Sequence, residues 1–234
     1  MVDAARHPKV EILAYSELER VEGYIGNFTA HVVSKPRYVI ADRCNGCGAC
    51  ARVCPIEVPN PFELGLAPRK AIDVPHGQAV PLIYQVDMDN CIHCYRCVDA
   101  CGKLDAIDFS QEPVTHELDV GTIIVATGFE SFDPAVVPEL GYGRYPNVVT
   151  AMELERLANS AGPTVGRLVR PSDGREPKSI VMVQCVGSRD ARYNEYCSGF
   201  CCMYTIKNAL LLKQSNHDMD VSILYMDIRT PSKG

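Results

Sequence analysis

The sequence predicts a mixed α/β fold that is interrupted by a small, cysteine-rich α+β insert. Two runs of four cysteines share one spacing between positions 44 and 101. A strand, a helix and a second strand follow one another over residues 179–226, which indicates a βαβ unit with a parallel sheet. Four segments are therefore predicted, over residues 1–36, 37–112, 113–175 and 176–234.

Composition excludes several classes of protein. The chain has 234 residues, of which 47% are hydrophobic and 22% charged, as in an ordinary globular protein. Its net charge of -6 provides no basic surface for nucleic acid. Twelve cysteines among 234 residues fall below the roughly 8–10% of a disulfide scaffold, and their grouping favours a reduced, cytoplasmic metalloprotein. Neither an export signal nor an apolar run long enough to span a bilayer is recognised.

The segments before and within the insert are predicted to differ in structure. Residues 9–16 are apolar and β-branched and predict a strand, whereas residues 21–33 predict a hairpin that turns at Gly26-Asn27. Six prolines lie within residues 55–83, which are predicted to be loop apart from one helical turn.

Regular structure is predicted again after the insert. Leu118–Ala126 is a continuous apolar run and predicts a strand that is buried on both faces. Residues 150–161 predict a helix with a capping box between Thr150 and Glu153. Residues 162–178 contain three prolines and three glycines and predict a loop.

The predicted βαβ unit has two buried strands, over residues 179–186 and 221–226. The helix between them covers residues 200–214. Its apolar side is expected to consist of Met203, Ile206, Leu210 and Leu211.

The two cysteine runs have the ligand spacing of a protein that binds two [4Fe–4S] clusters. Each run reads C-x2-C-x2-C-x3-C, and Pro55 follows the first run as this pattern expects. The first three cysteines of a run wrap one corner of a cube, whereas the fourth lies too far round and ligates the other cluster. The predicted ligands of cluster 1 are Cys44, Cys47, Cys50 and Cys101, and those of cluster 2 are Cys91, Cys94, Cys97 and Cys54.

A structural zinc site is the alternative interpretation of these cysteines. Zinc sites commonly pair two C-x2-C motifs across a longer gap, which the doubled runs fit poorly. His93 lies between two ligands and is interpreted as a loop residue, because the eight cysteines already fill both sites. Gly102 stands where a proline would follow the second run, a departure that concerns the exit of the chain rather than ligation.

Four further cysteines form a third group with the spacing C-x11-C-x3-C-C: Cys185, Cys197, Cys201 and Cys202. The first follows a predicted strand, and the last two open a predicted helix, whose N-terminus favours thiolates. Four such thiolates would suit another cluster. A redox-active dithiol and ordinary buried cysteines are the alternatives, and the spacing alone does not decide among them.

Nucleotide-binding motifs are weak in this chain. The pattern G-x-G-x-x-A occurs over residues 46–51, but it lies inside a cysteine run and opens no βαβ helix, so it predicts no NAD(P) site. Residues 121–128 read GTIIVATG and resemble the strand that flavoproteins of the disulfide-reductase type place beside FAD. A buried strand that ends in glycine is common, so this segment carries little weight by itself.

Together, these segments resemble the flavin- and iron–sulfur-containing A subunit of heterodisulfide reductase. The resemblance rests on RHPKVEILAYSELERVEGYIGNF, the two cysteine runs, GTIIVATGFE, and QCVGSRD followed by YCSGFCCMYTIKNALLLK. It implies a partial thioredoxin-reductase-like flavoprotein with a ferredoxin-like domain, carrying two [4Fe–4S] clusters, inserted over residues 37–112. Residues 1–36 and 113–175 would then belong to the FAD domain and a linker, and residues 176–234 to a nucleotide-binding-like domain with a cysteine-rich site.

The resemblance also implies further site residues. In that family the double-cysteine region is associated with a cluster beside the flavin, which favours a third [4Fe–4S] cluster at Cys185, Cys197, Cys201 and Cys202. Ala126, Thr127 and Gly128 are expected to contact FAD, and Lys207 falls where the family places a lysine near the flavin ring. A solvated helix lysine is the alternative for Lys207. Family members also carry a Rossmann segment before this region and further sequence after it, so the chain is expected to be an internal portion whose FAD binding needs another segment or chain.

Electron transfer is the predicted function. The resemblance implies the iron–sulfur part of a heterodisulfide-reductase-type oxidoreductase complex, in which flavin-based bifurcation couples reduction of a CoM-S-S-CoB disulfide to reduction of ferredoxin. The disulfide chemistry would lie on another subunit, so no catalytic residue is assigned. Implied partners are the other subunits, ferredoxin and an electron donor of the hydrogenase or formate-dehydrogenase type. The alternatives are a freestanding ferredoxin-like carrier without flavin, a zinc scaffold and an NAD(P)H:flavin oxidoreductase.

Overall fold

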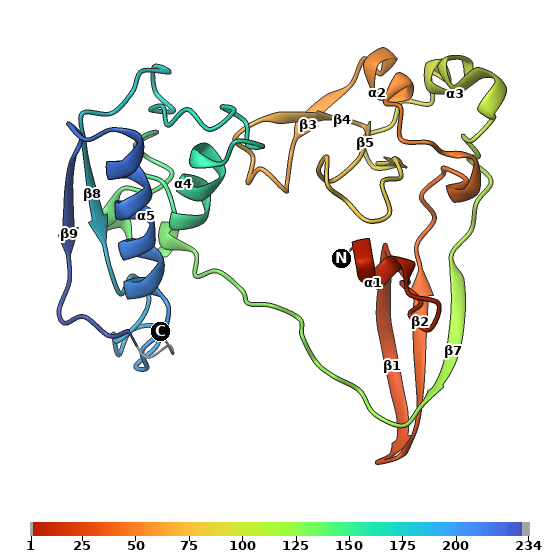
Figure 1. The fold of residues 1–234 in the computed structure, drawn as a ribbon, viewed down its shortest axis with the longest axis horizontal. Coiled ribbons are helices and arrows are strands. Elements are labelled where there is room, and N and C mark those ends of the chain that lie inside the picture. Colours follow the sequence, from red (N-terminus) through yellow and green to blue (C-terminus); the bar gives the residue numbers. More distant parts are fainter. Residues whose placement is uncertain (1, 231–234) are drawn as a thin grey trace. The chain divides into compact units, whose positions relative to one another are not determined.

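The structure is a computed structural model that describes residues 2–230, and its contacts divide the chain into two units (Figure 1). The first unit ends at Thr127 and the second begins at Gly128. The outer ends of the predicted segments 1–36 and 176–234 fall at residue 1 and residues 231–234, which lie outside the described part.

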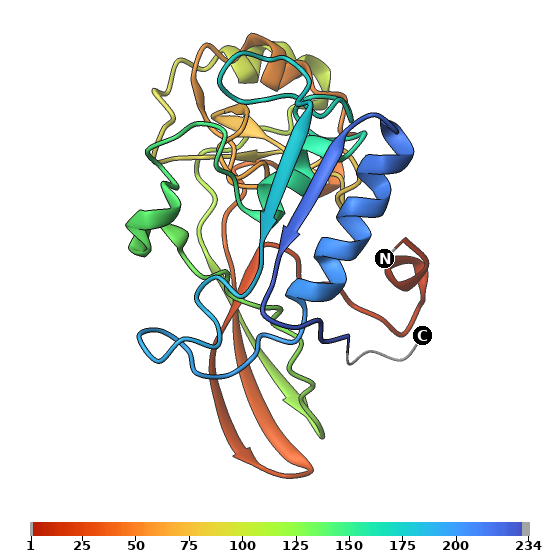
Figure 2. The ribbon, with the colours of Figure 1, turned by 90° about the vertical axis from the view of Figure 1, so that its left-hand side faces the viewer.

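The first unit contains a short helix, α1 (Val2–Arg6), and a three-stranded antiparallel sheet in the order β1-β2-β7 (Figure 2). The strands are β1 (Ser16–Tyr24), β2 (Asn27–Ser34) and β7 (Val114–Val120). β1 and β2 form the predicted hairpin. Because Tyr24 pairs with Asn27, the turn consists of Ile25 and Gly26, one residue earlier than predicted.

The strand predicted over residues 9–16 is wrong. β1 begins only at Ser16, which pairs with Ser34 at the end of β2. Tyr15 adopts a φ of 60°, which lies in the left-handed region and interrupts an extended strand. The residues before Tyr15 therefore have neither the backbone direction nor a neighbouring strand to continue the sheet.

The strand predicted over Leu118–Ala126 is also wrong in most of its length. β7 ends at Val120, which pairs with Phe28 beside the β1–β2 turn. Beyond that point no strand of the described residues continues the ladder. Ile124 and Val125 are therefore 88% and 78% exposed instead of buried on both faces.

The cysteine-rich region lies between β2 and β7 and is built from short elements. Its helices are η1 (Ala41–Arg43), α2 (Ala49–Val53), α3 (Arg96–Cys101) and η2 (Gly102–Leu104). Its strands are β3 (Glu57–Pro59), β4 (Pro68–Lys70), β5 (Ile72–Asp73) and β6 (Gln85–Val86), paired β3 with β4 and β5 with β6. Residues 55–83 thus contribute strands that were predicted as loop, and residues 61–65 form turns in place of the predicted helical turn.

The core of this region draws on both cysteine runs. Its buried members are Val39, Cys50, Ile72, Val86, Cys97 and Ala106. Ile72 and Ala106 are only 2% and 1% exposed. Helices α2 and α3 pack against each other, so the two runs fold as one module rather than as two separate loops.

The second unit contains the predicted βαβ arrangement. β8 (Ser179–Val183) and β9 (Asp220–Leu224) are parallel, and α5 (Cys201–Ser215) connects them. The unit also contains η3 (Pro134–Val136), η4 (Pro138–Leu140) and α4 (Ala151–Ala158). The capping box at Thr150 and Glu153 is confirmed, and residues 162–178 form no helix or strand, as predicted.

Two expectations about burial in this unit are wrong. The buried residues of α5 are Cys201, Cys202, Thr205, Asn208 and Leu212, whereas the predicted apolar side is exposed at Leu210 and Leu211 by 60% and 51%. In β8, Val181 and Val183 are 61% and 47% exposed. A two-stranded sheet with one helix alongside it (Figures 1 and 2) has too few neighbours to cover both faces.

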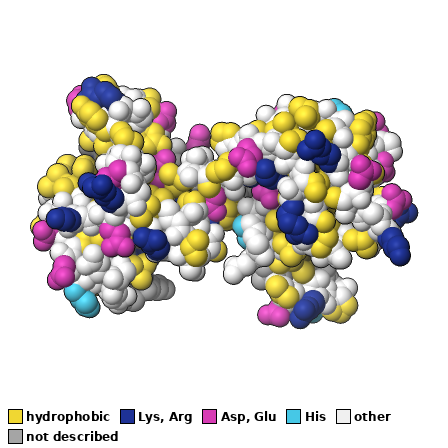
Figure 3. Space-filling view, turned by 90° about the horizontal axis from the view of Figure 1, so that it is seen from above, with side chains coloured by type: hydrophobic (Ala, Val, Ile, Leu, Met, Phe, Trp, Pro, Cys, Tyr) yellow, Lys and Arg dark blue, Asp and Glu magenta, His cyan; other side chains and the backbone are white. Residues whose placement is uncertain are grey.

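The longest helix among residues 2–230 is α5, with 15 residues. None of the helices in this range is long and apolar enough to cross a membrane. Figure 3 shows acidic and basic side chains interspersed with apolar ones on the face in view. This mixture agrees with a modest net charge of -6.

Candidate iron–sulfur sites

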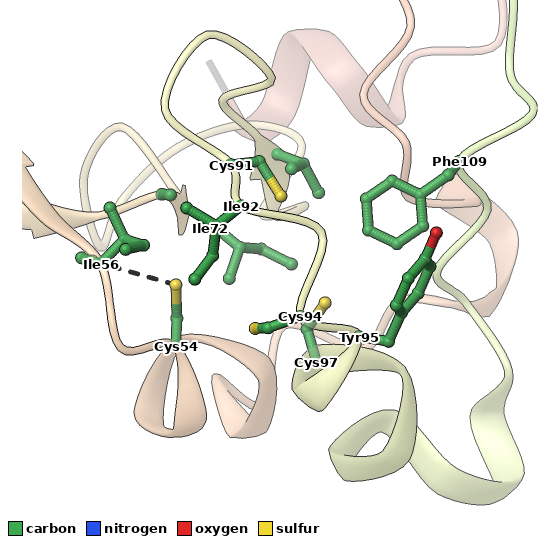
Figure 4. A pocket seen from close by; sticks show the side chains of 11 residues that line it. Cys54, Ile56, Ile72, Cys91, Ile92, Cys94, Tyr95, Cys97 and Phe109 are labelled. Atoms are coloured by element: carbon green, nitrogen blue, oxygen red, sulfur yellow. Dashed lines mark hydrogen bonds between the residues drawn. The ribbon is translucent and has the colours of Figure 1, made fainter.

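One cavity of the cysteine-rich region is lined by Cys54, Cys91, Cys94 and Cys97. It encloses about 350 Å³, part of which is open to solvent. Figure 4 shows these side chains directed toward one space, with Ile72, Tyr95 and Phe109 also in its wall. Three of the cysteines belong to the second run, whereas Cys54 comes from the end of the first.

A second cavity is lined by Cys44, Cys47, Cys50 and Cys101 and encloses about 320 Å³, again partly open to solvent. Val39, Ala106 and Ile107 give it an apolar wall. The two cavities therefore divide the eight cysteines into the same two sets that the spacing predicts as ligands. That these sets ligate clusters stays a prediction.

Helices α2 and α3 explain how each run reaches both cavities. Cys50 lies in the first turn of α2 and faces one cavity, whereas Cys54 caps the end of α2 and faces the other. At 1.5 Å per residue, these two positions are only about 6 Å apart along the helix axis. α3 has the same arrangement with Cys97 and Cys101, so the two cavities are close neighbours.

The loops that carry the first three cysteines of each run have matching backbone conformations. Gly46 and Gly48 have φ values of 71° and 73°, and the equivalent residues His93 and Tyr95 have φ values of 50° and 57°. A left-handed conformation at these two positions turns each loop around its cavity. The sequence indicates a positive φ only in the first run, because glycine adopts this conformation without strain. In the second run His93 and Tyr95 are residue types that rarely adopt it, so the sequence gives no such indication.

Replacing Gly48 by alanine is expected to destabilise the second cavity, whose wall includes Gly48. A Cβ at this position would lie 2.8 Å from the Tyr84 hydroxyl oxygen, and a left-handed alanine costs about 1–2 kcal/mol. Denaturant unfolding of the full chain should show a loss of that size. Gly77→Ala is the matched control, since its Cβ would meet no atom within 4 Å and its φ is not positive. Equal stabilities for the two variants would contradict this expectation.

The aromatic side chains around the second run form a small cluster. The ring centroid of Phe109 lies 5.5 Å from those of both His93 and Tyr95 and 6.4 Å from that of Tyr38. His93 is thus a packing residue of the loop, in agreement with its interpretation from the sequence. Packing of this kind offsets the backbone strain at His93 and Tyr95.

Burial makes both cavities unfavourable for free thiolates. Desolvation raises the pKa of the Cys50 thiol to about 12 and also raises the pKa of Cys97. Iron supplies the positive charge that offsets this desolvation when a thiolate binds. The Cys101 sulfur in addition accepts a hydrogen bond of 3.4 Å from the Ala106 amide.

Gly102 explains the departure from the usual proline after the second run. It adopts a φ of 56°, so the chain turns back immediately after Cys101. Proline is locked near a φ of about -65° and cannot take this conformation. After the first run the chain stays extended at Cys54, which leaves room for Pro55.

The structure brings three of the four remaining cysteines together. Cys185 lies two residues after the end of β8 with a φ of 59°, and its thiol is hydrogen-bonded with that of Cys201. Cys201 and Cys202 are the first residues of α5 and are only 5% and 4% exposed. Within residues 2–230, no hydrogen bond joins the half-buried Cys197 to this group.

The electrostatics of this third group lower the pKa of one thiol, that of Cys201. Burial acts to raise the pKa of Cys201, but hydrogen bonds from the Cys185 amide and from the Ser198 and Cys185 side chains outweigh it and lower that pKa. Desolvation raises the pKa of Cys185. Arg189 contacts the Cys185 sulfur and forms an ion pair with Asp227.

The residues expected to contact flavin are divided between the two units, with Ala126 and Thr127 in the first and Gly128 and Lys207 in the second. Ala126, Thr127 and Gly128 are exposed and belong to no strand. Lys207 lies on α5, where its Nζ is 2.7 Å from Glu155 Oε1 and its side chain is 50% exposed. Their role as FAD contacts stays a prediction.

Within the described residues, no three His, Cys, Asp or Glu side chains come close enough together to hold a single metal ion. The ligands of one zinc ion converge on a single centre, about 2.0–2.3 Å away. The ligands of a [4Fe–4S] cube each bind a different iron atom and surround a larger object. Each cavity is lined by four cysteines, which is the number of thiolates that a [4Fe–4S] cluster binds.

Comparison with known protein families defines the class of the cysteine-rich region. Residues 43–107 match the family described as 4Fe-4S dicluster domain. The region is thus a ferredoxin-like domain of the class that holds two [4Fe–4S] clusters, set in a mixed α/β chain.

Individual relatives extend the match to the whole chain. Over 235 aligned residues it is 55% identical to the iron-sulfur A subunit of the CoB–CoM heterodisulfide reductase of Methanocaldococcus jannaschii, and 48% identical to the A subunit of the H(2):CoB-CoM heterodisulfide,ferredoxin reductase of Methanothermobacter thermautotrophicus. Each alignment covers 100% of this chain and 36% of the relative. It is 45% identical to the A subunit of the Ferredoxin/F(420)H(2)-dependent CoB-CoM heterodisulfide reductase of Methanosarcina acetivorans, over 98% of this chain and 29% of the relative. The predicted resemblance to the A subunit of heterodisulfide reductase is confirmed, and the chain spans about a third of the length of these relatives.

Proposed function

We propose that this chain conducts electrons through two neighbouring [4Fe–4S] clusters as part of a heterodisulfide-reductase-type complex. The observation that carries this proposal is the division of eight cysteines between two cavities, four to each. The similarity to the A subunits of heterodisulfide reductases over the whole chain supports the assembly with other subunits of such a complex.

When bound, each cluster takes up and returns one electron. The protein supplies the four thiolates at each cavity and keeps water away with Val39, Ile72, Val86 and Ala106. Amide groups such as that of Ala106 donate to ligand sulfurs and stabilise the added electron. The single helical turn between Cys50 and Cys54 holds the two sites side by side, as conduction requires.

A third [4Fe–4S] cluster at Cys185, Cys197, Cys201 and Cys202 belongs to the same proposal. It is supported by the hydrogen bond between Cys185, after β8, and Cys201, at the start of α5, and by the lowered pKa of Cys201. Cys197 lies a few residues before that helix and would complete the set once the loop closes on the cluster.

The flavin part of the proposal rests on sequence resemblance alone. FAD would contact Ala126, Thr127, Gly128 and Lys207 within a thioredoxin-reductase-like flavoprotein, with another segment or chain completing the site. On the same ground we propose flavin-based bifurcation, which couples reduction of a CoM-S-S-CoB disulfide to reduction of ferredoxin. The electron donor would be of the hydrogenase or formate-dehydrogenase type, and the location cytoplasmic.

Anaerobic purification with iron, acid-labile sulfide, zinc and flavin counted per chain tests the proposal. We expect about twelve iron and twelve sulfide when all three clusters are present, and about eight when only the dicluster domain is loaded. Iron–sulfur absorbance without flavin, together with full activity toward generic donors, would support the freestanding carrier instead. About two zinc ions without sulfide would overturn the cluster assignment.

A further inference from the structure

The side chain of Gln184 has an unusual environment beside the third cysteine group. Gln184 immediately follows β8 and is only 7% exposed. Its Oε1 lies 3.0 Å from the sulfur of Cys202. Its Nε2 is the one buried side-chain nitrogen or oxygen in the described part of the chain that lacks a hydrogen-bond partner.

In this arrangement only one of the two polar atoms of the Gln184 amide has a partner. The Cys202 thiol donates its proton to Oε1, so the amide oxygen is satisfied while the amide nitrogen is not. Native proteins rarely leave a buried N–H group unpaired. The unpaired Nε2 therefore indicates a partner that Gln184 acquires in another state of the site.

Cluster binding provides that state. Cysteine binds iron as a thiolate, which has no proton to donate and accepts hydrogen bonds instead. Oε1 and the Cys202 sulfur would then be two acceptors facing each other at 3.0 Å. A half-turn about the last torsion of Gln184 exchanges Oε1 and Nε2, because this torsion has two nearly equivalent orientations. The turn removes the repulsion and gives Nε2 its acceptor.

We propose that Gln184 is a positioning residue of the third cluster, whose Nε2–H donates to the Cys202 sulfur in the loaded protein and raises the reduction potential of that cluster. The inference rests on the third cluster of the proposed function. The Arg229 amide nitrogen, 3.2 Å from the same sulfur, is a second donor. Hydrogen bonds to cluster sulfurs stabilise the more negative, reduced form and so raise the potential.

The Gln184→Leu variant of the full chain tests this role. Leucine has a similar volume but no N–H, so the potential of the third cluster should fall. We expect a change of about tenfold in the reduction equilibrium, equivalent to about 59 mV for one electron, in an EPR-monitored redox titration. The matched control is Gln214→Leu, the same change at an exposed position of α5, which should leave the potential unchanged. An unchanged potential in Gln184→Leu would overturn the inference.

A second measurement needs no substitution and covers the case in which Gln184→Leu fails to fold. Full chain labelled with ¹⁵N at the side-chain nitrogen of glutamine should show a ¹⁵N coupling to the reduced third cluster in pulsed EPR. Absence of this coupling, with about twelve iron bound per chain, would refute the role of Gln184 but not the assignment of a third cluster. Only about eight iron in the wild-type chain would refute the third cluster itself and the inference with it.

Discussion

Replacing Cys101 by alanine is expected to remove cluster 1, although Cys101 belongs to the second cysteine run. Its side chain lines the cavity of Cys44, Cys47 and Cys50, and not the cavity of the other three cysteines of its own run. Loss of one thiolate leaves a corner of the cube without a protein ligand. The variant should therefore lose about four iron atoms per chain when purified anaerobically.

The identity of the lost cluster decides whether the runs exchange their fourth ligands. The EPR signal that disappears in Cys101→Ala should be the one that disappears in Cys47→Ala, and it should persist in Cys94→Ala. Cys47 and Cys94 are both exposed and differ in the cavity that they line, so they are matched references. If Cys101→Ala and Cys94→Ala lost the same signal, each run would hold its own cluster and the exchange would be wrong.

Replacing Cys201 by alanine is expected to remove the third cluster and leave the other two in place. Cys201 opens α5, is 5% exposed and is hydrogen-bonded with Cys185, so its sulfur lies at the centre of the third group. Iron per chain should fall from about twelve to about eight, with the EPR signals of the dicluster domain unchanged. Iron analysis and EPR on the same anaerobic sample check both parts of this result.

The control for Cys201→Ala is Thr205→Ala. Thr205 lies one turn further along the same buried side of α5 and is 4% exposed, so its loss disturbs packing to a similar degree without removing a sulfur. It should retain all three clusters. Equal iron contents in Cys201→Ala and the wild-type chain would show that the third group binds no cluster.

Features that depend on local spacing could be predicted from the sequence. The eight cysteines divide between the cavities as their spacing predicts, because three ligands of a run are fixed by one short loop and the fourth by one turn of helix. The capping box at Thr150 and Glu153 was predicted for the same reason, since all its partners lie within four residues. The hairpin of β1 and β2 needed only the turn signal between two extended segments.

Features that depend on a distant partner could not be predicted in this way. The apolar run after Val120 looks like a buried strand, but a strand forms only where a neighbour pairs with it. Helical spacing groups Leu210 with Met203 on α5, yet it does not say which side of the helix is covered. The left-handed backbone at His93 and Tyr95 was hidden as well, because neither residue type signals it. The environment of Gln184 depends on Cys202, 18 positions further along the chain.

A reductive titration of the anaerobically purified chain counts the electrons that the protein takes up. Three clusters should accept about three electrons per chain, with bleaching of the iron–sulfur absorbance and the EPR signals of reduced [4Fe–4S] clusters. Uptake of about two electrons would agree with two clusters in the dicluster domain and would contradict a third cluster at Cys201. A chain that accepts no electrons while it carries stoichiometric zinc would contradict the proposal that it conducts electrons.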